Sequence, residues 1–321
     1  MIFSMQALPV PDPGQPAAGP AQGHRRRLLP GSREAWTAWA MLLPALLGLL
    51  LFYGLPAVRA VQISFTDWNL LRPARDVGWA NYQRLLQDDN FWHALKLSLY
   101  YVLLNIPLQT VLGLFLAVVM HRLTRSLFVK AVVLLPYLLS NVLVALIWLW
   151  LLDPVLGWVN HALVALAPLG AGPQPFFAGP DQALATVAAV NVWRHMGLVA
   201  MLFLAGLQNI PASLYEAAAL EGASEWQAFR RITLPLLRPV MVFVLVTSVT
   251  GSLQIFDTVA VTTQGGPAGA TQVVVQYIVQ IAFGYLKMGY ASAMSMVLCG
   301  LMLAYTVLQM RLMRADQNDM A

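Results

Sequence analysis

Polar side chains interrupt three of the long apolar runs of the sequence. They are phenol, hydroxyl, amide, guanidinium and imidazole groups at Tyr137, Ser140, Asn141, Asn191, Arg194, His195, Ser248 and Ser252. Such groups are costly inside hydrocarbon, so they usually face a cavity, a packed neighbour or a substrate. Counted at about 1.5 Å per residue from the ends of their runs, they fall at similar depths. We therefore predict a polar chamber that can form hydrogen bonds with a solute.

Two interpretations apply to these polar residues. Ser and Asn side chains also form hydrogen bonds between packed membrane helices, and this explains any one of them equally well. Arg194 needs a cavity, an acidic partner or a substrate, unless it extends along a tilted helix to the outer surface. We predict that Arg194 donates hydrogen bonds to hydroxyls or to an anionic group of a substrate. His195 without Arg194 would be interpreted as a packing residue.

The sequence contains no recognisable catalytic apparatus. No Gly is followed by Lys, so the phosphate-binding pattern G-x4-G-K-[ST] is absent. The histidines are scattered and Cys299 is the single cysteine, which leaves no H-E-x-x-H or paired-Cys metal signature. We predict no catalytic residue, no metal and no cofactor. The chain is therefore not expected to be an enzyme, and an energy source has to come from another subunit.

The composition is that of an integral membrane protein. Of the 321 residues, 59% are hydrophobic and only 10% are charged, whereas about a quarter of the residues of a soluble domain are charged. Lys and Arg lie mainly at the ends of apolar runs, as they do in membrane topology signals. The net charge of +5 therefore does not indicate nucleic-acid binding.

Six charge-poor runs are long enough to cross a hydrocarbon core of about 30 Å. They are residues 35–58, 97–120, 131–152, 182–207, 239–256 and 288–310. Basic residues are concentrated at every second connection between these runs, as expected for the cytoplasmic side. We therefore predict an all-α domain over 35–314 that has both termini in the cytoplasm. Residues 1–34, rich in Pro, Gly and Ala, are expected to be a disordered cytoplasmic tail, and 315–321 a second cytoplasmic tail. Residues 271–283 are apolar but too short for a seventh crossing, so we expect an interfacial or re-entrant helix.

One polar segment, residues 211–238, separates the fourth and fifth runs. Ser213 and Glu216 have the spacing of a capping box, and Gly222 lies where a left-handed residue would end that helix. Ser224 and Gln227 form a second capping box. The sequence therefore predicts two short helices joined by a glycine, on the cytoplasmic side.

The same segment resembles a known family. Glu216-Ala217-Ala218, Gly222 and Ile232-Thr233-Leu234-Pro235 reproduce the pattern E-A-A-x3-G-x9-I-x-L-P, the loop signature of permease subunits of binding-protein-dependent ABC importers. Phe256-Asp257, Gly265-Gly266-Pro267 and Ala282-Phe283 resemble the last external loop of the carbohydrate-uptake branch, whose members include maltose and glycerol-phosphate permeases. Glu221 stands where the family pattern has Asp, which keeps the charge.

The resemblance implies a type I ABC importer permease with six transmembrane helices and a cytoplasmic coupling helix. It implies that the coupling residues are Glu216, Ala217, Ala218, Gly222, Trp226, Phe229, Ile232, Leu234 and Pro235. It places the substrate path at Tyr137, Asn141, Asn191, Arg194, Ser248 and Ser252. The implied partners are two ABC ATPase subunits, a second similar permease, an extracytoplasmic substrate-binding protein and the lipid bilayer of a bacterial inner membrane.

The expected function is ATP-driven import of a sugar or related polyol by alternating access. Glycerol phosphate or another small solute is the alternative, because Arg194 would suit an anion and the loop signature is shared with amino-acid, phosphate and peptide importers. A self-contained secondary transporter would be expected to show inverted repeats or a membrane acid relay. Neither is evident in the sequence.

Overall fold

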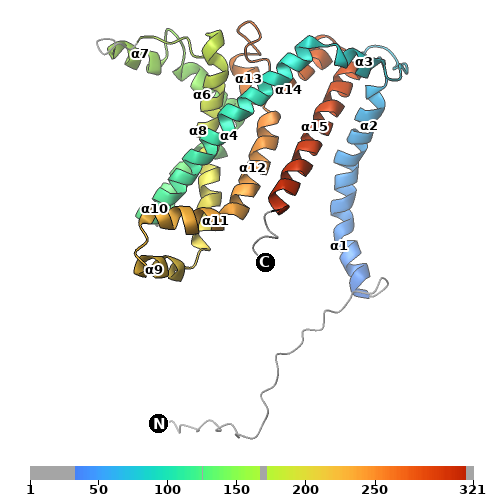
Figure 1. The fold of residues 1–321 in the computed structure, drawn as a ribbon. Helices are drawn as coiled ribbons and strands as arrows, with labels where there is room; N and C mark the ends of the chain where they lie inside the picture. Colours follow the sequence, from blue (N-terminus) through green and yellow to red (C-terminus); the bar gives the residue numbers. More distant parts are fainter. Residues whose placement is uncertain (1–32, 125, 167–171, 316–321) are drawn as a thin grey trace, which may run out of the picture. The chain divides into compact units, whose positions relative to one another are not determined.

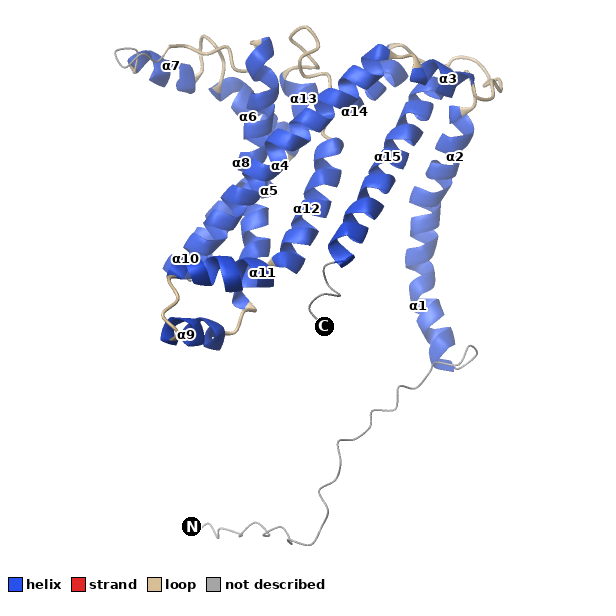
Figure 2. Cartoon of the chain, viewed as in Figure 1, coloured by secondary structure: helices blue, strands red, loops and turns tan. Residues whose placement is uncertain are grey.

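Helices form nearly all of the regular structure, and Figure 2 shows no strand in the described part of the chain. The structure is a computed structural model that describes residues 33–124, 126–166 and 172–315. The predicted tails, 1–34 and 315–321, therefore lie almost wholly outside the described residues. The chain divides into two compact units, residues 1–57 and 58–321, and the sites discussed below belong to the second.

The helices follow one another along the chain as shown in Figure 1. The first unit contains α1 (Arg33–Leu49) and a π-helical turn, Leu50–Gly54, which continues into α2 (Leu55–Ser64). The second unit continues with α3 (Ala80–Leu86), α4 (Asp89–Leu123), α5 (Leu127–Leu138), α6 (Asn141–Leu151), α7 (Trp158–Ala165), α8 (Pro180–Gln208), α9 (Ala212–Leu220), α10 (Glu225–Ala228), α11 (Leu234–Leu236), α12 (Arg238–Leu253), α13 (Asp257–Thr262), α14 (Val274–Val279) and α15 (Met288–Ala315).

Five helices of the described residues are long and apolar enough to cross a membrane. They are Trp36–Ser64, Asp89–Leu123, Pro180–Gln208, Arg238–Thr262 and Met288–Arg311, and a sixth span results if α5 and α6 are counted together. The prediction of an all-α membrane protein is confirmed. α4 starts earlier than the predicted run 97–120, because the Asp88 carboxylate accepts a hydrogen bond of 3.2 Å from the Phe91 amide and caps the helix.

The predicted span 131–152 is not one straight helix. α5 ends at Leu138 and α6 begins at Asn141, with a bend of 92° between them. Leu139 is extended, and the Ser140 Oγ accepts a hydrogen bond of 3.2 Å from the Leu143 amide as the N-cap of α6. A serine that bonds to nearby backbone amides favours a new helix start over continuation of the old helix. Apolar composition alone did not reveal this break.

Close helix packing surrounds α8. α4 runs along α8 (Figure 1), and Gly113 of α4 lies against Val199. On another face of α8, a Cβ at Gly197 would collide with the backbone carbonyl of Val133 in α5. Small residues let membrane helices approach in this way. Gly197 therefore lets α8 pack closely against the middle of α5, one turn from Arg194.

The segment predicted to be too short for a crossing forms α14 and a π-helical turn, Gln280–Gly284. It packs against α4 and α15. The Ser98 Oγ accepts a hydrogen bond of 2.8 Å from the Val274 amide, and the Tyr277 hydroxyl donates to an Asp88 carboxylate oxygen at 3.0 Å. These contacts attach the segment to the first turns of α4.

Candidate transport cavity and coupling loop

A cavity of about 360 Å³ opens among α4, α5, α6, α8, α12 and the start of α13. Small-molecule sites commonly have volumes of about 300–1,000 Å³. Five of the predicted path residues line it: Tyr137, Asn141, Asn191, Ser248 and Ser252. The structure therefore brings side chains from three predicted spans together at one cavity. Contact between these residues and a substrate stays a prediction.

The break between α5 and α6 supplies two of these residues. Tyr137 lies in the last turn of α5, and Asn141 is the first residue of α6. The Asn141 Nδ2 donates to the Asp257 Oδ2 at 2.8 Å, whereas its Oδ1 is buried and has no hydrogen-bond partner. One acceptor beside the cavity is thus left for another donor.

α8 contributes Asn191 and His195. The Asn191 Nδ2 donates to the Val187 carbonyl at 3.1 Å and to the Thr258 Oγ1 at 3.3 Å. The His195 Nε2 lies 2.9 Å from the Arg194 Nη1, and its Nδ1 lies 2.9 Å from the Asn191 carbonyl. Because a guanidinium can only donate, Nε2 is the acceptor and Nδ1 carries the proton. His195 is therefore neutral in this arrangement.

Arg194 differs from its predicted position, because it is not among the residues that line the cavity. Its Nη2 donates to the Tyr137 carbonyl at 3.1 Å and to the Leu139 carbonyl at 2.9 Å. Its guanidinium also lies 5.2 Å from the centroid of the Tyr137 ring. These carbonyls have lost their helical partners at the break, and a cation suits the carboxyl end of a helix. In this structure Arg194 therefore stabilises the break between α5 and α6, and its contact with a solute stays a prediction.

Sequence reasoning missed several polar residues of the lining, and three of them matter most for its chemistry. Asn105 and Gln109 lie on α4, and Asp257 begins α13. The two amides are four residues apart in an otherwise apolar run, so they share one helix face. That spacing was the available signal. Asp257 was named for the likeness of the last external loop and was not assigned to the chamber.

The loop 211–238 folds into the two predicted short helices. Gly222 has φ +76°, and the Gly222 and Ala223 amides donate to the Ala219 carbonyl at 3.1 Å and the Ala218 carbonyl at 2.9 Å. This is a Schellman motif, in which glycine is favoured because it adopts the left-handed conformation without strain. The predicted left-handed end of the first helix is confirmed.

The predicted capping box at Ser213 and Glu216 is wrong. α9 begins at Ala212 with Pro211 as its N-cap, and no side chain caps it. Ser213 is already inside the helix, so its hydroxyl is not at the N-cap position from which it could reach the free amides. The proline, whose φ is fixed near the helical value, begins the helix before the serine. The Glu216 carboxylate is left exposed on α9.

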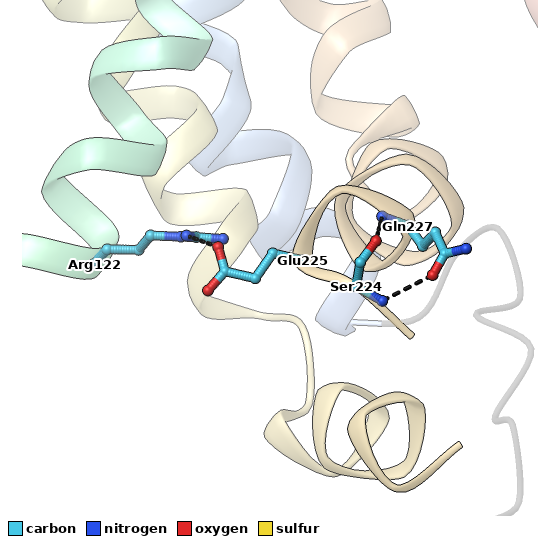
Figure 3. Close-up of polar contacts among 4 residues, drawn as sticks. All are labelled: Arg122, Ser224, Glu225 and Gln227. Carbon is cyan, nitrogen blue, oxygen red and sulfur yellow. Dashed lines mark hydrogen bonds and ion pairs between the residues drawn. The ribbon is translucent and has the colours of Figure 1, made fainter. Parts of the chain in front are cut away.

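The second capping box is confirmed (Figure 3). The Ser224 Oγ accepts from the Gln227 amide at 3.3 Å, and the Gln227 Oε1 accepts from the Ser224 amide at 2.8 Å. The ring of Trp226, in α10, stacks on that of Phe229 with centroids 5.6 Å apart. A π-helical turn over Phe229–Thr233 then leads into α11.

The other predicted coupling residues are exposed or partly buried on the loop. Ala217 and Pro235 are exposed, Trp226 is 68% exposed, and Ala218, Phe229, Ile232 and Leu234 are partly buried. Leu220, at the end of α9, is 91% exposed. The Tyr215 and Thr233 hydroxyls are hydrogen-bonded at 2.8 Å, which ties α9 to the π-helical turn. The loop therefore presents apolar surface on a locally fixed scaffold.

An ion pair joins α4 to the loop (Figure 3). The Arg122 Nη1 lies 2.6 Å from the Glu225 Oε2, and the two side chains are 53% and 81% exposed. Exposed pairs of this kind contribute about 0–1 kcal/mol, because water and salt screen them.

Breaking this ion pair is expected to have little effect. Arg122→Gln should change the free energy of unfolding by less than about 1 kcal/mol and leave solute uptake within about twofold of the wild-type rate. A thermal unfolding curve and an uptake assay on the same preparation measure both quantities. The single variants Arg122→Gln and Glu225→Gln should each change the free energy of unfolding and the uptake rate no more than the double variant does. A loss of uptake in each single variant that is equally large in the double variant would show that the pair is needed for coupling.

A bundle of apolar helices around a polar cavity, with an exposed helical hairpin at one end, defines a membrane transport subunit. The sequence pattern of the family described as "Binding-protein-dependent transport system inner membrane component" matches residues 109–315. The trehalose/maltose transport system permease protein MalF of Thermococcus litoralis is 33% identical over 287 residues, covering 88% of this chain and 95% of that protein. The sn-glycerol-3-phosphate transport system permease protein UgpA of Yersinia pestis is 31% identical over 285 residues, with 88% and 95% covered.

A solved structure has the same fold. It is a bacterial alginate ABC transporter in complex with an alginate pentasaccharide-bound periplasmic protein, and its matching chain has a TM-score of 0.76 and 25% identity. The match covers 88% of this chain and 96% of that chain. The chain therefore belongs to the family of inner membrane components of binding-protein-dependent transport systems. The predictions of an ABC importer permease, and of a transport subunit instead of an enzyme, are confirmed.

Proposed function

We propose that this permease moves a neutral sugar or related polyol through the cavity by alternating access. The observation that carries the proposal is the chemistry of the lining. Amide and hydroxyl side chains alternate with aromatic and aliphatic ones, which suits a solute with hydroxyl groups and apolar C–H faces. MalF, at 33% identity, is named for trehalose and maltose.

The charge of the lining favours a neutral solute over an anionic one. Among the described lining residues, Asp257 is the only one that carries a full charge, and neither Lys nor Arg belongs to the lining. Arg194 donates to carbonyls at the break between α5 and α6. A phosphate ester would meet the Asp257 carboxylate, and like charges at close range repel. The Arg194 guanidinium interacts electrostatically with Asp257, but its Nη2 donates to the carbonyls of the break and not into the cavity. Glycerol phosphate, suggested by the likeness to UgpA, remains the second candidate.

The loop 211–238 is proposed as the site that docks on the ATPase subunits. Exposed apolar side chains on a polar loop mark a surface for a protein partner, and Leu214, Leu220 and Trp226 are 41%, 91% and 68% exposed. The proposed assembly adds a second permease, two ATPase subunits and a substrate-binding protein. The positive charges near Arg122 and Arg230 support a cytoplasmic position for this end and for both termini.

The proposal is tested by uptake into proteoliposomes that contain the permease with its partner subunits and binding protein. Trehalose, maltose and sn-glycerol 3-phosphate serve as probes, each with and without ATP. We expect ATP-dependent uptake of a neutral sugar that is about tenfold faster than that of the phosphate ester, because repulsion of about 1.4 kcal/mol corresponds to a factor of ten. The reverse order would overturn the neutral-solute proposal. Uptake without ATP would overturn the proposed energy coupling.

A further inference from the structure

Two buried amides on α4 form part of the cavity wall. Asn105 and Gln109 are 3% and 4% exposed and lie one helical turn apart. Buried amides in an apolar helix are costly unless they are hydrogen-bonded. Both side chains point toward α12, where Ser252 and Ser248 lie at matching heights.

The direction of these hydrogen bonds determines what the serines can do. The Asn105 Nδ2 donates to the Ser252 Oγ at 3.0 Å, and the Gln109 Nε2 donates to the Ser248 Oγ at 3.1 Å. Each serine therefore acts as an acceptor toward α4 and keeps its own hydroxyl proton. Thr247 and Thr250 on the same helix donate to the carbonyls of Phe243 at 2.8 Å and Val246 at 2.9 Å. No such bond uses the Ser248 or Ser252 proton within the described residues.

The remaining atom of the pair is an unpaired acceptor. The Asn105 Nδ2 also donates to the Gln109 Oε1 at 3.3 Å, whereas the Asn105 Oδ1 is buried and has no hydrogen-bond partner. A buried acceptor without a donor is unfavourable, so its persistence beside a cavity points to a ligand. The wall thus offers two hydroxyl donors and one amide acceptor, and a sugar hydroxyl can both accept from the former and donate to the latter.

We propose that Asn105 binds a hydroxyl group of the transported solute through its Oδ1, and that Gln109 is a positioning residue that orients Ser248. This inference rests on the proposed function, because it concerns the solute of the same cavity. Ser252 and Ser248 donate to oxygen atoms of the solute. The wall formed by α4 and α12 therefore selects solutes whose hydroxyls alternate donor and acceptor roles. Ether or ester oxygens, which only accept, leave the Asn105 oxygen unpaired.

The test removes one hydroxyl group of the solute and the Asn105 side-chain amide, first separately and then together. Uptake of trehalose and of each monodeoxy-trehalose is measured in proteoliposomes at saturating binding protein, for the wild type and Asn105→Leu. In the wild type, one deoxy derivative should move about fivefold more slowly than trehalose, which is the value of a typical hydrogen bond. In Asn105→Leu that difference should vanish, because the partner of the missing hydroxyl is gone. An unchanged difference would overturn the inference.

Thr110→Val is the matched control, since Thr110 adjoins Gln109 on α4 but does not line the cavity. It should keep the wild-type difference between trehalose and its deoxy derivatives. Should Asn105→Leu fail to fold, Ser252→Ala gives the same comparison from α12, with the difference reduced for the hydroxyl that accepts from Ser252. An undiminished difference for every hydroxyl in that variant would likewise overturn the inference.

The two proposals fail in different ways. If the wild type imports only sn-glycerol 3-phosphate, the neutral-solute proposal is wrong, and the α4 pair is tested on that ester and its two deoxy analogues, the phosphates of propane-1,2-diol and propane-1,3-diol. A difference in uptake rate between the ester and an analogue that disappears in Asn105→Leu supports the proposed role of Asn105. A difference that persists overturns it.

Discussion

Arg194→Ala is expected to lower uptake by about tenfold or more and to destabilise the folded protein. The Arg194 Nη2 bonds to the Tyr137 and Leu139 carbonyls at 3.1 and 2.9 Å. Each hydrogen bond to a charged group contributes about 1.5–3 kcal/mol. The loss of two such bonds should therefore cost at least about 3 kcal/mol of the free energy of unfolding. The freed end of α5 also carries Tyr137, and the start of α6 carries Asn141, both of which line the cavity. Uptake rate and melting temperature are the measurements.

Further variants separate support of the break from contact with the solute. If Arg194 supports the break, Arg194→Ala slows every transported solute by the same factor, and Arg194→Lys recovers part of the uptake because an ammonium can still donate to a carbonyl. Arg59→Ala is the control, since Arg59 bonds to Gln62 on an exposed helix face. Loss of uptake confined to anionic solutes, with an unchanged melting temperature, would restore the sequence-based assignment of Arg194 to the substrate.

Gly222→Val is expected to uncouple ATP hydrolysis from uptake. Gly222 has φ +76°, and the left-handed conformation costs an ordinary residue about 1–2 kcal/mol, more for a β-branched one. A Cβ at this position would meet no atom within 4 Å. The expected effect is therefore conformational, not steric: the Schellman motif opens and α9 loses its fixed direction relative to α10. The number of ATP molecules hydrolysed per solute imported should rise about tenfold or more, since 1.36 kcal/mol corresponds to a factor of ten.

Two matched variants test that reasoning. Gly222→Asn should keep most of the coupling, because asparagine tolerates the left-handed region better than other residues. Gly300→Val places the same β-branched side chain on α15, where a Cβ also meets nothing within 4 Å and φ is not positive. It should leave the coupling ratio unchanged. Normal coupling in Gly222→Val would show that the ATPase contact does not depend on this turn.

Local patterns were sufficient for the coupling loop. Gly222 and the Ser224–Gln227 box act within a few residues of the backbone, so their spacing predicts their conformation. Ser213 failed because Pro211 begins the helix earlier. Pro211 and the Ser213–Glu216 spacing both indicate a helix start, and local sequence alone does not determine which of the two overlapping starts forms.

The cavity could be predicted in part. Depth along apolar runs correctly brought together residues of the third, fourth and fifth spans, because crossing a bilayer fixes the height of each residue. It could not show which way a side chain points around its helix. For this reason Arg194 was assigned to the chamber, although it bonds to the break, and Asn105 and Gln109 were overlooked on a run that looked uniformly apolar.

The sequence by itself determined the membrane class, the approximate spans, the family signature and the polar hairpin. These depend on composition, on charge at span ends and on short-range backbone preferences, all of which act locally along the chain. The tertiary structure alone decided the 92° break between α5 and α6, the attachment of Arg194 to it and the pairing of α4 amides with α12 serines. The last two join residues far apart in the chain, and the direction of each hydrogen bond depends on how the helices are rotated against one another. The break is local, but an apolar run with a serine at its middle is compatible with one straight helix as well.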